Sequence, residues 1–232
     1  MVEILRRSQI EAASRFHKRL AQWRLSDCTL LKLREVMPGW DEEACLLKCI
    51  AVNTLYATQV FAIVRMAQHV RHVIANREIN DSDRLVETIS NIPSSKGRKT
   101  RSFISFASKL CHFFVDAERF PIYDEAARNV LEFHLEEKYR QGDEDKYKTF
   151  CLNFEDLRRT IEGSLNSRDL DRYLWVAGMF MKWRKERSKA KPQMNVELFN
   201  LFSSPTSDDI SDLVALLPLQ MSTDLRGQQE HR

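Results

Sequence analysis

The stretch SFASKLCHFFVDAERFPIYDEAARNVL, residues 102–128, contains a lysine and an aspartate whose types and spacing can support nucleophilic chemistry. Lys109 falls at the margin of an apolar helical stripe, next to Phe106 and Phe113. Burial among apolar groups lowers the pKa of an amine, and a neutral amine attacks sp² or oxocarbenium carbon. The alternative interpretation is a lysine whose stem covers the edge of the core while its charge stays in water.

Asp124 follows the short segment 121–123 and is expected to begin the next helix. An aspartate at that position caps the helix through its side chain, and the helix dipole keeps the carboxylate ionised. Capping is a structural role that holds whether or not the residue does chemistry. Because Lys109 and Asp124 stand on consecutive elements joined by a tight connection, their side chains can converge on one cleft.

The segment SFASKLCHFFVDAERFPIYDEAARNV resembles the signature of the helix-hairpin-helix DNA glycosylases, in their bifunctional branch. In that family a lysine nucleophile on the second hairpin helix is followed, after a short loop, by an aspartate that opens the next helix. Lys109 matches the lysine and Asp124 the aspartate. The resemblance implies that Lys109 attacks the sugar carbon C1′ and displaces the base, while Asp124 stabilises positive charge on the sugar and helps to activate the lysine.

The likeness covers roughly residues 45–180 and is closest to small proteins with the 8-oxoguanine glycosylase fold. It implies an all-α, helix-hairpin-helix glycosylase-like fold with two helical lobes and a cleft between them. The implied partner is duplex DNA that contains a damaged or modified base, which such enzymes flip out of the stack. The chemistry requires no metal and no cofactor.

Three further residues resemble the base pocket of the oxoguanine-type enzymes. Asp171 and Trp175 lie four residues apart on one helical face, where the family has residues that read and stack on the base. Phe113, one turn after the lysine, matches an aromatic residue on the other side of that pocket. For Trp175 a place in the core remains an alternative, because residues 173–181 are apolar nearly all round the helix. Thr58 and Gln59 resemble the segment with which the family enters the duplex.

One departure from the family concerns phosphate binding. The family's hairpin contains glycines whose amides grip the DNA backbone, whereas this chain has TRSFISFASK, without glycine. Phosphate contacts are therefore expected from basic residues, and the candidates just upstream are Lys96, Arg98, Lys99 and Arg101. The missing glycines also favour the alternative function, a non-catalytic helical module that binds nucleic acid or protein.

Apolar residues recur with helical spacing along the chain, and no alternating strand pattern persists, so we predict an all-α fold. Ser26 and Asp27 are expected to cap the second helix, and Asp41 the third. Helices are predicted at residues 4–23, 26–36, 41–70 (with a break near 56–58), from 82 onward, 100–114, 124–139, 154–161, 168–187 and 208–217.

Charge and composition divide the chain into a domain and a tail. Residues 1–202 have a net charge of +6 and are interpreted as one domain, compatible with nucleic-acid binding. Within it we expect a central bundle at about 45–125 and a second lobe from the N-terminal helices with 126–202. Residues 203–232 have a net charge of −3 and are expected to form an acidic, partly disordered tail.

The five cysteines have neither the spacing of a zinc site nor an even number for pairing, so we expect reduced thiols. The N-terminal segment mixes charges and lacks the apolar core of a signal peptide, and no segment reaches membrane-spanning length. The sequence therefore predicts a cytoplasmic protein without membrane association, expected to be a monomer.

Overall fold

The computed structural model describes residues 4–76, 84–93, 102–142, 145–189 and 193–218, and within these it is helical with no strand. The all-α class is thereby confirmed. The chain divides into two compact units. Unit 1 comprises the described residues of Met1–Arg24, Asp124–Tyr139 and Asn153–Arg232, and unit 2 those of Leu25–Tyr123 and Arg140–Leu152.

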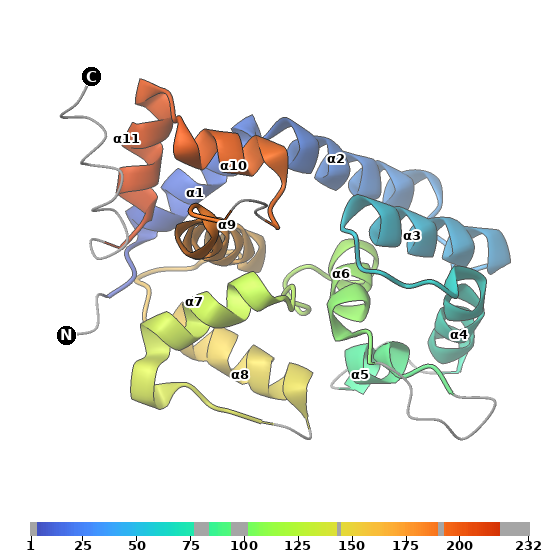
Figure 1. The fold of residues 1–232 in the computed structure, drawn as a ribbon. Coiled ribbons are helices and arrows are strands. Elements are labelled where there is room, and N and C mark those ends of the chain that lie inside the picture. The colour runs from blue at the N-terminus through green and yellow to red at the C-terminus, as the bar shows by residue number, and fades with distance from the viewer. Residues whose placement is uncertain (1–3, 77–83, 94–101, 143–144, 190–192, 219–232) are drawn as a thin grey trace. The chain divides into compact units, whose positions relative to one another are not determined.

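Unit 1 is built around α9 (Ser167–Glu186), a helix of 20 residues. It packs against α1 (Arg7–Arg19), α7 (Glu125–Leu135) and α10 (Val196–Ser203), and Figure 1 shows it in the middle of these three. The helix α11 (Ser207–Leu216) also packs against α1. A short 3-10 helix, Glu136–Lys138, follows α7.

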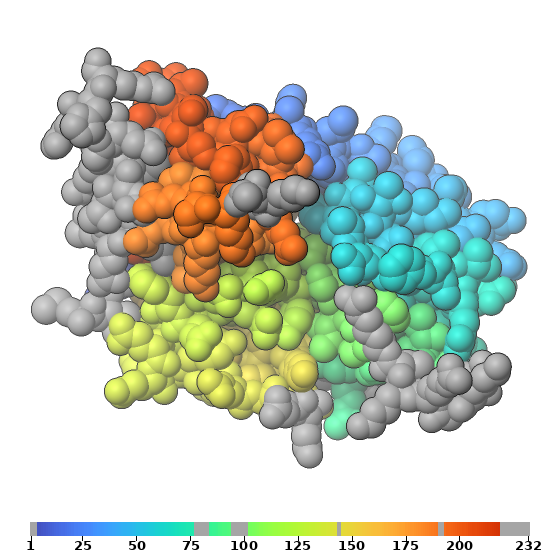
Figure 2. Space-filling model, in the orientation of Figure 1, coloured from blue at the N-terminus to red at the C-terminus, as the bar shows by residue number. Residues whose placement is uncertain are grey.

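Aromatic rings fill the core of unit 1. The Phe202 ring lies 6.4 Å from that of Phe16 and 5.4 Å from that of Phe180, measured between centroids. Trp183 is buried beside them, and its indole N–H donates a hydrogen bond to the Ser203 hydroxyl at 3.0 Å. In the space-filling view, side chains close the gaps between neighbouring ribbons inside each unit (Figure 2).

Unit 2 contains α3 (Glu42–Leu55), α4 (Ile63–Ala75), α5 (Leu85–Ser90) and α6 (Ile104–Phe114), with parts of α2 (Ala21–Val36) and α8 (Lys146–Arg159). The core helix is α6, because every residue from 106 to 114 is buried. It packs against α3 and α5, and α3 packs against α4.

The N-terminal helices differ from the prediction. The expected helix 4–23 is interrupted at Leu20, whose backbone is extended, so that α1 ends at Arg19 and α2 begins at Ala21. Asp27 lies inside α2 and accepts a hydrogen bond from the Tyr56 hydroxyl. The predicted cap at 26–27 is therefore wrong, because α2 already begins at Ala21 and the Asp27 carboxylate binds Tyr56, the residue that follows α3.

Other boundaries follow the local signals more closely. Asp41 caps α3 by accepting a hydrogen bond from the Ala44 N–H at 2.9 Å, and α3 ends at Leu55, so the cap and the break near 56–58 are confirmed. In contrast, α6 begins at Ile104 and α8 at Lys146, four residues later and eight residues earlier than predicted. The sequence analysis missed α10, which Asn195 caps.

Gly178 sets the separation of α7 and α9. A Cβ atom at this position would lie 2.4 Å from the Ala126 carbonyl oxygen, a distance that real Cβ contacts do not reach. Only a residue without a side chain lets the backbones of the two helices approach so closely. The crossing therefore depends on this glycine.

We expect Gly178→Ala to destabilise unit 1. Alanine is better than glycine in a helix by about 1 kcal/mol, but overpacking against a backbone oxygen costs about 1–3 kcal/mol and outweighs that gain. The measurement is the free energy of unfolding in urea. Gly39→Ala is the control, because its Cβ would meet a side-chain oxygen of Asp41 at 3.3 Å. A higher unfolding midpoint for Gly178→Ala would contradict the role of the close crossing.

Candidate active site

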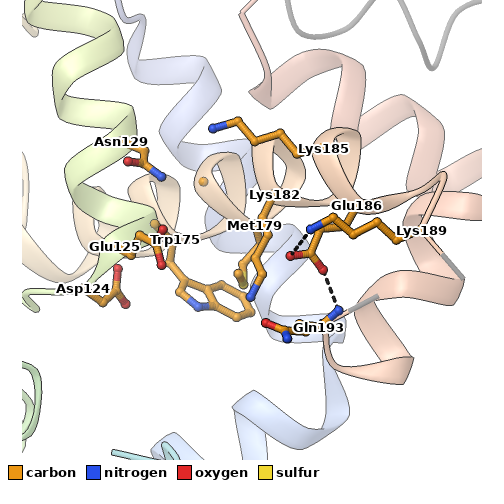
Figure 3. A pocket seen from close by; sticks show the side chains of 12 residues that line it. Asp124, Glu125, Asn129, Trp175, Met179, Lys182, Lys185, Glu186, Lys189 and Gln193 are labelled. Atoms are coloured by element: carbon orange, nitrogen blue, oxygen red, sulfur yellow. Dashed lines mark hydrogen bonds and ion pairs between the residues drawn. The ribbon is translucent and has the colours of Figure 1, made fainter. Parts of the chain in front are cut away.

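A pocket of about 390 Å³ lies in unit 1 between α7 and α9 and the segment that follows α9 (Figure 3). Its volume is in the range of small-molecule sites. The lining combines carboxylates, lysines and one large aromatic ring: Asp124, Glu125, Ala126, Asn129, Trp175, Gly178, Met179, Lys182, Lys185, Glu186, Lys189 and Gln193.

Asp124 stands at the start of α7 and lines this pocket. One of its carboxylate oxygens accepts a hydrogen bond from the Ala127 N–H at 2.8 Å, which confirms the predicted cap. The cap fixes the backbone and the side chain of Asp124 at the pocket wall. Glu125, the first residue of α7, adds a second carboxylate there.

Trp175 forms an aromatic wall of the pocket and is half-buried. Its ring packs 4.8 Å from that of Trp23 and 5.8 Å from that of His17, measured between centroids. In Figure 3 the indole lies between Asp124 and Glu125 at one end of the pocket and Lys182 and Gln193 at the other. The sequence left a fully enclosed core tryptophan open as an alternative, and the exposed pocket-facing part of the ring excludes it.

The other end of the pocket is basic. Lys182 is half-buried, Lys185 and Lys189 are exposed, and all three line the pocket. Lys189 pairs with Glu186 at 3.5 Å, and the Glu186 carboxylate also accepts the Gln193 N–H at 2.6 Å. Within the described part of the chain, Lys182 makes no ion pair or hydrogen bond, so its ammonium is available to an anion. Sequence reasoning missed Lys182, which stands in an ordinary basic run.

Asp171 lies one turn before Trp175 on α9, as predicted, but it is buried and does not line the pocket. Phe113 is also buried, in unit 2, where its ring lies 5.6 Å from that of Tyr56. The pocket of unit 1 thus contains Asp124 and Trp175 of the five residues predicted for catalysis and base binding.

Lys109 lies in unit 2 with only 5% of its surface exposed. Its ammonium donates a hydrogen bond to the Ser105 hydroxyl at 2.9 Å, one turn earlier on α6, and lies 5.8 Å from the centre of the Tyr56 ring. The lysine is thus largely withdrawn from water beside an aromatic ring. Tyr56 was missed as a neighbour because 53 residues separate it from Lys109.

Unit 2 contains a second buried lysine, Lys48 on α3, which the sequence analysis also missed. Its ammonium donates to the Gly39 carbonyl oxygen at 2.5 Å and lies 4.1 Å from the centre of the Trp40 ring. Burial lowers the pKa of Lys48 from its ordinary value. With 1% of its surface exposed, Lys48 is enclosed by its own protein partners. Its signal in the sequence is a charge inside the apolar run ACLLKCIAV.

The two residues predicted to enter the duplex lie in the loop between α3 and α4. The Thr58 hydroxyl donates a hydrogen bond to the Asn53 side chain at 2.9 Å. Gln59 is exposed and has a positive φ of 58°. The predicted phosphate contacts Lys96, Arg98, Lys99 and Arg101 lie outside the described residues.

The described residues hold no group of three or more histidine, cysteine or acidic side chains arranged for a metal ion. All five cysteines are free thiols, and Cys45, Cys49 and Cys111 are buried. Burial raises the pKa of the Cys45 thiol to about 11 and that of Cys49 to about 12. None of the described helices is long and apolar enough to cross a membrane.

A family model matches the N-terminal half of the chain, and a relative is similar over part of it. The family model HI_0787_N, an N-terminal domain, matches residues 9–119. An uncharacterized protein of Haemophilus influenzae is 30% identical over 132 residues. That match covers 54% of this chain and 62% of the relative, so the chain spans less than two thirds of the relative's length. No solved structure matches.

The thiols provide a test of the buried core around α3 and α6. At pH 8 a water-soluble thiol reagent should modify the exposed Cys28 rapidly. Cys45, Cys49 and Cys111 should react only after unfolding in urea, because burial excludes the reagent and a thiol with a pKa near 11 is only about one part in a thousand thiolate at pH 8. Mass spectrometry of the modified peptides measures both rates. Equal modification of all five in the native protein would contradict the packing.

Proposed function

We propose that this protein is a DNA glycosylase that flips a damaged or modified base out of the duplex and excises it through a lysine nucleophile. The observation that carries the proposal is the pocket of unit 1, in which Asp124 and Trp175 lie together with Lys182, whose ammonium makes no ion pair with the described residues. The proposal includes a helix-hairpin-helix glycosylase fold, in which two lobes surround a cleft. It also includes a cytoplasmic monomer that requires no metal or cofactor.

The pocket has the chemistry that a flipped nucleobase needs. A base offers a flat π-face, and Trp175 supplies an aromatic surface for stacking. The edge of a base carries N–H donors and oxygen or nitrogen acceptors, and Glu125 and Asn129 supply a carboxylate and an amide within the same lining. Asp171, by its place one turn from Trp175, is proposed to support this wall rather than to read the base itself.

The lysines that line the pocket can bind the phosphate backbone of the DNA. DNA binding depends on neutralised phosphates, and the hairpin of this chain lacks the family's glycine amides. Lys182 and Lys185 are therefore proposed as phosphate contacts beside the pocket, together with the upstream set Lys96, Arg98, Lys99 and Arg101.

Lys109 is the proposed nucleophile. Its amine forms a bond to C1′ while the bond between C1′ and the base breaks, and the electron pair leaves with the base, which takes up a proton. The amine loses its proton and the sugar ring opens to give a Schiff base. Asp124 is proposed to stabilise the positive charge that develops on the sugar. The proposal is supported by the place of Lys109 on α6, where its amine is largely withdrawn from water beside the Ser105 hydroxyl and the Tyr56 ring.

The second candidate function is a non-catalytic module that binds nucleic acid through the same pocket. One observation favours it: Lys109 exposes 5% of its surface and already donates to Ser105, which is how a structural lysine is satisfied. The two functions differ in one product. Only the glycosylase forms a covalent bond between a lysine and the sugar.

Trapping with borohydride tests the nucleophile. Wild-type protein incubated with lesion-bearing duplexes should yield a covalent adduct, because borohydride reduces a Schiff base to a stable amine. Lys109→Gln should abolish both the adduct and base release while keeping the helical circular dichroism spectrum. The matched control is Lys48→Gln, which alters the other buried lysine of unit 2 and should retain the adduct. Asp124→Asn should slow base release by about 10²-fold or more, because it removes the negative charge that is proposed to stabilise the sugar. The fold should be kept, because asparagine caps a helix as well as aspartate does.

The adduct must also map to the right residue. Peptide mass spectrometry should find the modified amine at Lys109 and leave Lys48 unmodified. An unchanged rate of base release in Lys109→Gln would sink the lysine mechanism. DNA binding with neither an adduct nor base release on any lesion would favour the binding module instead, whereas base release without an adduct would make water the nucleophile.

Trp175→Ala should weaken binding to the flipped base by about 1–3 kcal/mol, the usual loss of one stacking partner, while affinity for undamaged duplex stays nearly unchanged. Trp175→Phe is the matched control, since it keeps an aromatic face toward the pocket. Fluorescence anisotropy on lesion and undamaged duplexes measures both affinities. Equal losses on the two duplexes would remove Trp175 from base recognition.

A further inference from the structure

Another cavity of unit 1, with a volume of about 380 Å³, lies between α1 and the start of α9. It shares no lining residue with the pocket that contains Asp124 and Trp175. Most of its polar side chains recur along one face of α1, and the turn before α9 forms the facing wall. The lining residues are Arg7, Ile10, Glu11, Ser14, Arg15, Lys18, Ser164, Leu165, Asn166 and Asp169.

The two carboxylates of this cavity already have partners within the protein. Glu11 pairs with the Nε atom of Arg7 at 3.2 Å. Asp169 pairs with Arg172 at 3.0 Å, and it accepts a hydrogen bond from the Ser14 hydroxyl at 2.6 Å. The lining holds three cations against these two carboxylates, and Arg172 compensates one of the carboxylates from outside the lining. The cavity therefore has an excess of positive charge.

Two of the cations are weakly engaged by the protein. The Lys18 side chain is exposed, and it makes no hydrogen bond or ion pair with the described residues. Arg15 lies 3.7 Å from one oxygen of Asp212, a carboxylate that Arg19 holds more closely at 2.5 Å. Because exposed ion pairs stabilise a fold little, Arg15 can exchange this carboxylate for the oxygen of a ligand. Both cations are thus available to an anion.

Gly163 brings the turn before α9 close to the guanidinium of Arg7. Its φ of 82° is one that residues with a Cβ rarely adopt, and a Cβ there would lie 3.0 Å from the Nη1 atom of Arg7. Among the described residues, the polar partner of Arg7 is Glu11, which contacts the Nε atom. The outer nitrogens of this guanidinium therefore remain as donors, in the fork geometry that suits phosphate oxygens.

The donors of this cavity favour a phosphate group over a carboxylate. Besides the cations, the Ser164 hydroxyl and the Asn166 amide are part of the lining and can donate hydrogen bonds. A phosphate ester offers three oxygens and a charge of about −2, whereas a carboxylate offers two oxygens and a single charge. None of the described lining residues is aromatic, so a base has no ring here on which to stack. The volume is that of a small-molecule site.

We propose that this cavity binds the phosphate group of a small phosphorylated molecule, with Arg7, Arg15 and Lys18 as the charged contacts. The two arginines meet phosphate oxygens through their planar guanidinium groups, and the lysine adds a point charge. The site uses none of the residues proposed for base excision. It therefore stands or fails independently of the glycosylase chemistry.

The test is isothermal titration calorimetry of the full chain with inorganic pyrophosphate, in a chloride buffer. Wild-type protein should bind pyrophosphate at least about tenfold more tightly than acetate, which has fewer oxygens and less charge. Lys18→Gln should weaken pyrophosphate binding by about tenfold, as expected for the loss of one charge-assisted contact. Arg24→Gln is the matched control and should bind as wild type does, because it removes one positive charge from an exposed residue of unit 1 outside the cavity.

Ser164→Asp is a second variant, which adds a carboxylate to the lining at an exposed position. It should abolish pyrophosphate binding and keep the helical circular dichroism spectrum. Four results would overturn the inference: no binding by wild type, equal affinities for pyrophosphate and acetate, equal losses in Lys18→Gln and Arg24→Gln, or unchanged binding in Ser164→Asp. A wild type that ignores pyrophosphate, while Lys18→Gln loses affinity for undamaged duplex, would also overturn it and assign these cations to the DNA backbone.

Discussion

The contact between Gly178 and the backbone at Ala126 is the constraint on which unit 1 depends. It lets α9 cross α7 at a separation that any side chain would prevent. The N-terminal end of α7 and the middle of α9 thereby face one space, so Asp124 and Trp175 line the same pocket. A pair of helices held apart by two side chains would leave a wider, shallower groove. The shape of the pocket wall that carries Asp124 and Trp175 therefore depends on this one missing Cβ.

The two buried lysines of unit 2 illustrate how partners decide the role of a charge. The Lys48 ammonium donates to the backbone carbonyl of Gly39 and lies over the Trp40 ring. Lys109 donates to the hydroxyl of Ser105 on the same helix and lies beside the Tyr56 ring. A buried ammonium is costly unless it is hydrogen-bonded, and both lysines meet that requirement.

The family match and the pocket cover different parts of the chain. Residues 9–119 match the N-terminal domain family and include Lys109 and the loop between α3 and α4. The pocket begins at Asp124 and continues through α9, beyond that match. Since the proposed chemistry joins Lys109 to Asp124, it would combine the matched region with a segment outside it.

The sequence by itself determined the features that depend on near neighbours. The caps at Asp41 and Asp124 and the long helix α9 follow from hydrogen bonds and apolar spacing within a few residues. It gave the types of the candidate groups at 109, 124 and 175 but not their surroundings. Only the tertiary structure decided that Asp27 serves Tyr56 instead of a cap, that Lys182 faces the pocket, and that α1 and the start of α9 line one cavity. Each of these depends on contacts between residues distant in the chain. Helical periodicity predicts which face of a helix is apolar, but it does not predict which other helix that face will contact.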